Sequence, residues 1–167
     1  GESICFLRTD KRLDSTVNPK KINFEKTVEL KNFESAVSKS FILDKTSGRA
    51  IYPDYKPQKT ELGSWENLYG KDFSGDIVYK TDFELDFEPI GTSMISLGKV
   101  EHSASVKING EFAGCAVFKP MEIYSHSKYF KKGKNTIEIT VSNTAANQFV
   151  LSDADKLFEQ KEIGPYN

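Results

Sequence analysis

The 167-residue sequence predicts an all-β fold, an antiparallel sandwich or barrel with one or two short peripheral helices. Two observations carry this prediction. The second half of the chain contains several runs in which apolar and polar residues alternate, and turn-forming residues separate these runs. Roughly six to nine short strands with turns every 8–12 residues are typical of β-sandwiches and barrels. A chain of this length can build one hydrophobic core of its own.

The first third of the chain gives the least regular pattern. Residues 22–33 favour one or two strands, and residues 52–75 carry enough prolines and glycines to be mostly loop. Between them, residues 35–43 favour a short helix, because small and apolar side chains recur at helical spacing on one side. These side chains are Ala36, Val37, Ser40 and Phe41.

Residues 77–87 give the clearest strand. Its apolar side carries Ile77, Tyr79, Thr81, Phe83, Leu85 and Phe87. The residues between them are mostly charged, so this strand is predicted to have one buried and one solvent-exposed face. Pro89 and Gly91 end the strand, and Met94–Leu97 is predicted to be the next one.

A hairpin is predicted around Asn109-Gly110. This dipeptide between two strand patterns is the strongest short-range hairpin signal, because both turn residues must adopt positive φ. The first strand begins near His102, which falls on the apolar side and is therefore expected to be a core histidine. The return strand continues toward Pro120 and contains Cys115 in an apolar run. We expect a buried free thiol there, with a Cys5–Cys115 disulfide as the alternative.

The end of the chain contributes one further clear strand. Lys131–Asn135 is predicted to be a polar turn, and residues 137–141 alternate cleanly after it. Residues 149–151 could add one more strand. Ser152 or Asp153 could cap a short helix that runs to Gln160.

Composition excludes several classes of partner. With 23 basic and 24 acidic residues, the net charge of −1 gives no electrostatic reason to expect nucleic acid or an anionic membrane. No run of 18 apolar residues occurs, so we expect no membrane span. The chain starts at Gly1-Glu2-Ser3 without an initiator Met, and we expect it to be a piece of a larger protein.

Several short motifs between Leu62 and Asn147 follow one another in the order of a known domain. They include Leu62-Gly63-Ser64-Trp65, Phe73-Ser74-Gly75-Asp76-Ile77-Val78-Tyr79, Ala104-Ser105-Val106-Lys107-Ile108-Asn109-Gly110, Lys132-Gly133-Lys134-Asn135-Thr136-Ile137 and Val141-Ser142-Asn143-Thr144. Through them the chain resembles the galactose-binding-like jelly-roll domain of glycoside hydrolases. It is most similar to the sugar-binding domain of family 2 enzymes and to the C-terminal sandwich of rhamnosidase-like enzymes.

The resemblance implies a jelly-roll β-sandwich over residues 22–167, after an N-terminal extension of residues 1–21. It also implies carbohydrate as a partner, a neighbouring catalytic domain, and a secreted, periplasmic or cell-surface location. Related sandwiches often hold a structural calcium ion, and Asp72 and Asp76 are nearby oxygen donors, although the site cannot be placed. We expect no other cofactor. Many domains of this fold serve only as scaffold, so the fold alone does not establish binding.

Two groups of residues are candidates for carbohydrate binding. Sugars present apolar C–H faces to aromatic rings, and their hydroxyls need carboxylate or amide partners. Trp65, Glu66 and Tyr69 supply this mixture within five positions, although packing of Trp65 on the sandwich edge is the alternative. Tyr124 and His126, in the predicted loop after Pro120, form the second group, with an ordinary surface loop as the alternative.

No catalytic machinery is predicted for this chain. Asp82, Glu84, Asp86 and Glu88 project from one strand face at a spacing of roughly 6.6–7 Å. Although this spacing suits paired carboxylates, a solvated face that discourages edge-to-edge aggregation explains them better. No nucleophile elbow and no phosphate-binding loop occurs in the sequence.

The sequence therefore predicts a non-catalytic carbohydrate-binding or accessory domain of a larger glycoside hydrolase or surface protein. The alternatives are a structural scaffold that braces a catalytic domain, and a sandwich module that recognises another protein.

Overall fold

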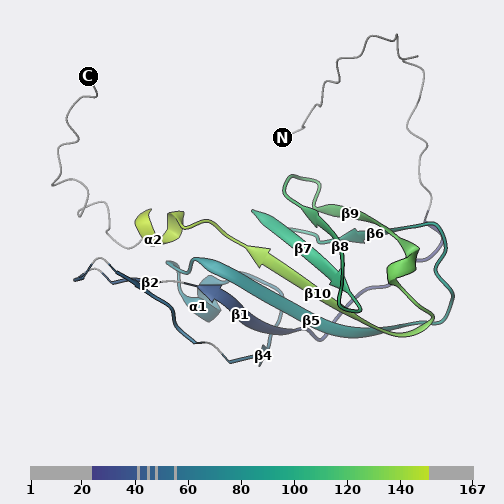
Figure 1. Cartoon of the computed structure of the whole chain (residues 1–167), viewed down its shortest axis with the longest axis horizontal. Coiled ribbons are helices and arrows are strands. Elements are labelled where there is room, and N and C mark those ends of the chain that lie inside the picture. The colour runs from purple at the N-terminus through teal and green to yellow at the C-terminus, as the bar shows by residue number, and fades with distance from the viewer. Residues whose placement is uncertain (1–23, 41, 45, 48, 55, 151–167) are drawn as a thin grey trace, which may run out of the picture.

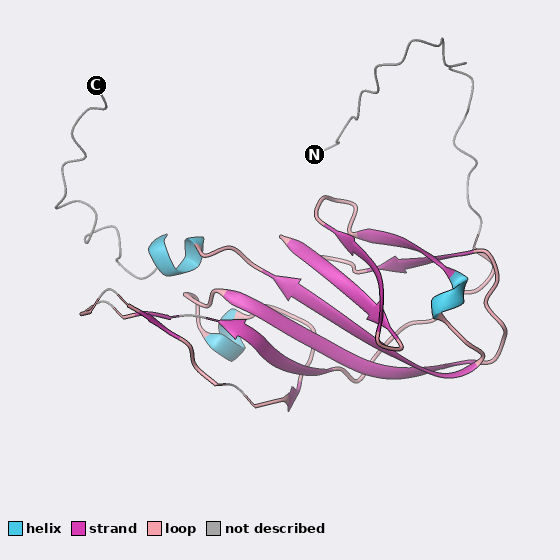
Figure 2. Ribbon diagram, viewed as in Figure 1, coloured by secondary structure: helices cyan, strands magenta, loops and turns pink. Residues whose placement is uncertain are grey.

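The computed structural model describes residues 24–40, 42–44, 46–47, 49–54 and 56–150. Two antiparallel sheets of unequal size form a sandwich, which confirms the predicted fold class (Figures 1 and 2). The large sheet has the strand order β4-β1-β5-β10-β7-β8, and the small one pairs β6 with β9. The large-sheet strands are β1 (Glu34–Ser40), β4 (Gln58–Lys59), β5 (Gly75–Leu85), β7 (Ser103–Ile108), β8 (Glu111–Ala116) and β10 (Gly133–Ser142).

The small sheet consists of β6 (Thr92–Ser96) and β9 (Glu122–His126), and a separate hairpin pairs β2 (Ile42–Leu43) with β3 (Ala50–Ile51). Three short helical turns complete the described structure. They are α1 (Glu66–Tyr69), the 3-10 turn Ser127–Tyr129 and α2 (Ala146–Val150). No helix among the described residues is long and apolar enough to cross a membrane.

Strand β5 confirms the predicted alternation. Ile77, Tyr79 and Leu85 are buried on its inner side, whereas Lys80, Asp82 and Glu84 are exposed on its outer side. Strand β10 pairs with β5 from Gly133↔Leu85 to Ser142↔Asp76. This long ladder aligns the two apolar faces and forms the floor of the core.

The β7–β8 hairpin turns at Asn109-Gly110, as predicted. Asn109 has a φ of 52° and Gly110 a φ of 86°, so both turn residues adopt the left-handed conformation that this tight turn requires. The Asn109 side chain also bridges to the neighbouring strand, where its Oδ1 accepts from the Thr136 backbone amide at 3.0 Å.

The predicted helix at residues 35–43 is wrong, because this segment forms β1 and β2. β1 pairs with β5 from Glu34↔Lys80 to Ser40↔Gly75, so the backbone hydrogen bonds are made across the sheet rather than within a helix. The buried Ser35 hydroxyl, 2.5 Å from Thr60 Oγ1, faces the interior. The short run of small residues was compatible with both periods, and tertiary pairing decided between them.

The end of the described chain also differs from prediction. Residues 149 and 150 belong to α2 rather than to a strand, and residue 151 lies outside the described residues. The chain leaves the sheet after Ser142, and the Asn143 side chain then forms hydrogen bonds with the backbone at the start of β5. Asn143 Oδ1 accepts from the Gly75 amide at 2.8 Å, and its Nδ2 donates to the Phe73 carbonyl at 2.8 Å. The helix predicted from Ser152 or Asp153 to Gln160 lies outside the described residues.

Two side chains predicted to be buried are exposed. Cys115 is a free thiol, but it lies on the outer face of β8 opposite Ser105. A register shift in the β7–β8 pairing brings Ala113 and Ala116 to the inner face instead. His102 precedes the first residue of β7 and is exposed, because the ladder with β10 ends at Ser103. Cys5, the other half of the disulfide alternative, lies outside the described residues, as do the N-terminal extension and the domain boundary at residue 22.

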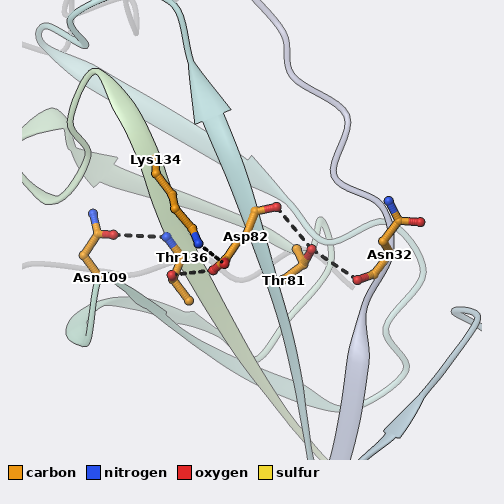
Figure 3. Close-up of polar contacts among 6 residues, drawn as sticks. All are labelled: Asn32, Thr81, Asp82, Asn109, Lys134 and Thr136. Atoms are coloured by element: carbon orange, nitrogen blue, oxygen red, sulfur yellow. Dashed lines mark hydrogen bonds and ion pairs between the residues drawn. The ribbon is translucent and has the colours of Figure 1, made fainter.

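A polar network ties β5, β10 and the β7–β8 turn together on the outer face (Figure 3). The Asp82 carboxylate accepts from Lys134 Nζ at 2.8 Å and from Thr136 Oγ1 at 2.6 Å. These hydrogen bonds hold the pKa of Asp82 below its ordinary value, and the same ion pair raises the pKa of Lys134. On the inner side, the Thr81 hydroxyl donates to the Lys31 carbonyl at 2.7 Å and so attaches the segment before β1.

Gly75 fixes the junction between β1 and β5, and its substitution tests that junction. A Cβ at Gly75 would lie 2.0 Å from the Lys39 carbonyl oxygen and 2.8 Å from Ser40 Cα. We expect Gly75→Ala to lower the free energy of unfolding by about 1–3 kcal/mol in denaturant titration. Gly63→Ala is the matched control, because no atom lies within 4 Å of its Cβ, and its effect should stay within about 1 kcal/mol. Equal stability of Gly75→Ala and the native protein would contradict this account of the junction.

The Asp82 network predicts a pH-dependent contribution to stability. A carboxylate whose pKa is lowered by folding stabilises the folded state above its ordinary pKa of 3.8, and this contribution is lost as the pH falls below that value. Asp82→Asn should therefore lower the unfolding midpoint at pH 7, and the difference from the native protein should shrink toward pH 2. Glu84→Gln removes a carboxylate from the same exposed face without breaking the network and serves as control. A difference that stays constant from pH 7 to pH 2 would contradict the assignment.

Candidate functional site

An open groove lies between the two layers. Its volume is about 1330 Å³, and its floor is the inner face of β5 and β10, where Phe83, Ile139 and Val141 remain only half-buried. Strand β6 and the extended segment of residues 24–30 form further parts of its lining. The groove exists because the small sheet covers only part of the large one, with β9 packed beside β8 and away from β1 (Figure 1).

Strand β6 presents its free edge to the groove. Consecutive residues from Thr92 to Leu97 line the groove, although neighbouring residues on a strand point to opposite faces. Within the described part of the chain, the ladder partner of β6 is β9 alone. An open apolar floor therefore lies beside an unpaired strand edge, and both are accessible to a ligand.

The segment of residues 24–30 is fastened at the end of the groove that lies near the β5–β6 connection. Lys26 Nζ forms an ion pair with Asp86 at 3.4 Å and lies 4.3 Å from the centre of the Phe87 ring. The Phe24 ring contacts Tyr124, with 6.5 Å between ring centroids. These contacts are at the surface and individually weak, so this wall depends on several of them together.

Trp65 lies at the end of the groove near the start of α1, where it packs against the sandwich and also lines the groove. Its half-buried ring meets Phe73 edge-on, with centroids 5.4 Å apart, and its Nε1 donates to the Tyr79 hydroxyl at 2.6 Å. Burial raises the pKa of that Tyr79 hydroxyl. Trp65 also lines the groove, and the exposed Glu66 lines it next to Trp65 at the start of α1. The indole is thus fixed in orientation by contacts behind it.

Tyr69 is on α1 too, but it is not among the groove-lining residues. Its ring packs on Phe73 with centroids 5.0 Å apart, and its hydroxyl accepts from Gln58 Nε2 at 3.3 Å. Its hydroxyl also lies 3.4 Å from the Ser35 Oγ. In this structure Tyr69 connects α1 to the edge strands β1 and β4.

Tyr124 and His126 lie on β9, so the predicted loop after Pro120 is a strand. They occupy alternate positions, and both are exposed, whereas Ile123 and Ser125 between them are buried. The Tyr124 hydroxyl donates to Glu122 Oε2 at 2.9 Å, which raises the Tyr124 pKa. His126 Nδ1 accepts from the Lys128 amide at 3.0 Å. The structure brings these two together on the outer face of the small sheet, apart from Trp65 and Glu66 in the groove.

The groove is also lined by residues that were not predicted from the sequence to bind a ligand. The loop between β6 and β7 and the turn after α1 add Lys71, Lys99 and His102 at the end near Trp65, where β10 also ends. Phe83 and Phe87 add aromatic surface along the floor. Sequence reasoning could not find these residues as a group, because segments that are distant in the sequence bring them together.

The structure separates the four carboxylates from Asp82 to Glu88. Asp82 and Glu84 face solvent on the outer side of β5, away from the groove, Asp86 binds Lys26, and Glu88 lines the groove. The lowered pKa of Asp82 is the opposite of what a general acid needs. The described residues include no group of three or more His, Cys, Asp or Glu placed to hold a metal ion.

Comparison with solved structures supports the fold. The chain is similar to part of a rhamnosidase from Novosphingobium sp. PP1Y, with a TM-score of 0.50 and 24% identity over 86% of this chain and 13% of that one. An FMN-binding β-glucuronidase from Facaelibacterium prausnitzii L2-6 gives a TM-score of 0.43 and 18% identity, covering 67% of this chain and 18% of that one. A GH2 β-galacturonidase from Eisenbergiella tayi gives 0.42 and 20%, covering 68% and 20%.

No family model and no curated protein matches the sequence. The chain spans only 13–20% of the length of these three enzymes, so it corresponds to a small part of each. The identity to the rhamnosidase is below the level at which function can be transferred, and the likeness therefore concerns architecture. The resemblance predicted from the sequence is confirmed at this level: the chain has the β-sandwich fold of a domain found within large glycoside hydrolases.

Proposed function

We propose that this chain is a non-catalytic accessory module of a larger glycoside hydrolase and that it binds a glycan in the groove beside Trp65. The observation that carries the proposal is the open groove of about 1330 Å³, which is lined by aromatic rings and bordered by ionisable groups. The fold shared with a part of the Novosphingobium rhamnosidase supports it. A secreted, periplasmic or cell-surface location and a neighbouring catalytic domain belong to the same proposal.

The groove suits a sugar chain better than a compact ligand, because its volume of about 1330 Å³ is larger than that of an ordinary small-molecule pocket. Apolar faces of the sugar rings would lie against Trp65 and the half-buried Phe83 on the floor. Glu66, Lys71 and Lys99 at the border would exchange hydrogen bonds with the hydroxyls. We expect modest affinity, since each bound hydroxyl first loses its hydration.

A bracing role is the second candidate, and a separate observation favours it. Phe112, Val117 and Phe118 on β8 and just after it are 58%, 54% and 66% exposed. Apolar side chains that stay exposed do not stabilise the isolated domain by burial. These three lie within seven positions and would suit contact with an adjoining domain or another protein. This role does not require a glycan.

A glycan array followed by calorimetry tests the proposed function. Trp65→Ala should lower the affinity for any bound glycan more than about tenfold, which corresponds to about 1.4 kcal/mol. Glu66→Gln should weaken binding in the same direction without touching the core, because Glu66 is exposed. Phe112→Ala is the matched control, since Phe112 is an exposed aromatic residue on β8 outside the groove.

Circular dichroism must accompany these titrations, because Trp65 also packs on Phe73. Loss of binding in Tyr124→Ala with unchanged binding in Trp65→Ala would move the site to Tyr124 and His126 on the outer face of β9. A blank array with well-folded protein would refute glycan binding and leave the bracing role as the better account.

A further inference from the structure

The groove reaches the free edge of β6, and the outer face of the small sheet begins on the other side of that edge. Every residue from Thr92 to Leu97 lines the groove. Among the described residues β6 pairs with β9 alone, so no further strand separates the groove from the outer face. A ligand in the groove can therefore extend around β6 without displacing any paired strand.

Phe24 connects the groove to the outer face. This residue lines the groove, and the centroid of its ring lies 6.5 Å from that of Tyr124, with the two ring planes tilted by 35°. Both side chains are accessible, since Phe24 is 39% exposed and Tyr124 is 55% exposed. An aromatic surface thus continues from the lining of the groove to the outer face of β9.

The strand register places polar groups beside these two rings. Residues that lie opposite each other in an antiparallel ladder point to the same face, and the register pairs Thr92 with His126 and Met94 with Tyr124. The two pairs are about 7 Å apart along the strands. Thr92 and His126 are both exposed. A hydroxyl and an imidazole therefore lie next to the exposed ring of Tyr124.

Two hydrogen bonds orient the side chains of this outer face. The Tyr124 hydroxyl donates to Glu122 Oε2 at 2.9 Å, and His126 Nδ1 accepts from the Lys128 amide at 3.0 Å. Because Nδ1 is an acceptor, the neutral imidazole carries its proton on Nε2 and presents a donor there. The Glu122 carboxylate would repel an acidic sugar at this place, so the residues suit a neutral one.

We propose that the glycan site continues around the free edge of β6 to an outer subsite, where Phe24 and Tyr124 contact the ring of a neutral sugar. Thr92 and His126 bind its hydroxyls. The inference rests on the proposed function, because the outer subsite extends a chain that is already bound beside Trp65. The ligand class is therefore an extended neutral oligosaccharide. Two subsites that are occupied by one chain bind it more tightly than either subsite binds a short ligand.

Calorimetry on the full chain with ligands of increasing length tests this inference. The probes are β-1,4-linked oligosaccharides of glucose, xylose, mannose and galactose, each from the disaccharide to the hexasaccharide. In a series that binds, the affinity for the hexasaccharide should exceed that for the disaccharide at least about tenfold. Tyr124→Ala should remove this gain and leave the disaccharide affinity unchanged, whereas Trp65→Ala should weaken binding of both ligands.

Two further variants separate stacking from other effects. Tyr124→Phe keeps the ring and loses only the hydroxyl bonded to Glu122, so most of the hexasaccharide affinity should remain. Phe112→Ala removes an exposed aromatic residue from β8 and should change neither affinity. In ¹⁵N-labelled protein, the amide signals of Tyr124 and His126 should shift with the hexasaccharide and stay in place with the disaccharide.

Equal affinities for the hexasaccharide and the disaccharide would overturn the inference, and so would equal hexasaccharide affinities of Tyr124→Ala and the native chain. In both cases, weaker binding by Trp65→Ala would retain the proposed function. Hexasaccharide binding that is lost in Tyr124→Ala and unchanged in Trp65→Ala would remove the groove as a site, and the extension with it. Absence of binding in all four series would also overturn the inference, and the wider glycan array would then decide the proposed function separately.

Discussion

The pairing of β5 with β10 is the interaction on which the rest of the structure depends. The ladder from Gly133↔Leu85 to Ser142↔Asp76 runs through the middle of the large sheet, so β1 joins it on one side and β7 on the other. Because the side chains alternate strictly, this ladder produces an apolar inner face and a charged outer face together. The Asp82–Lys134 ion pair and the Lys80–Glu138 ion pair both cross it on the outer side.

The unequal size of the two layers connects this architecture to function. A six-stranded apolar face opposite a two-stranded sheet leaves part of its floor accessible, and the groove is the consequence. Trp65 closes one end of the groove with its ring fixed by Phe73 and Tyr79, so its orientation does not depend on a ligand. Two apolar surfaces of the domain remain exposed. A bound glycan would cover the floor of the groove, and a neighbouring domain would cover the surface around Phe118.

Local signals in the sequence were sufficient for the strands whose burial alternates cleanly. Residues 77–85 and the Asn109-Gly110 turn follow directly from side-chain period and turn chemistry. Residues 35–43 did not, because small residues fit either period and the partner strand decided between them. The candidate site was only partly accessible to sequence reasoning. Trp65 and Glu66 were identified, but the groove requires three distant segments, and the free edge of β6 is a property of the sheet and not of its residues.

The central claim is that a glycan occupies the groove next to Trp65. Trp65 is the only tryptophan in the chain, so its fluorescence reports on this one position without further labelling. We would titrate the protein with the strongest hit of a glycan array. The sample is excited at a wavelength that tryptophan alone absorbs, and the emission spectrum is recorded. The account predicts a saturable change in intensity and emission maximum, with the same midpoint as calorimetry. Binding measured by calorimetry without any change in Trp65 emission would contradict it.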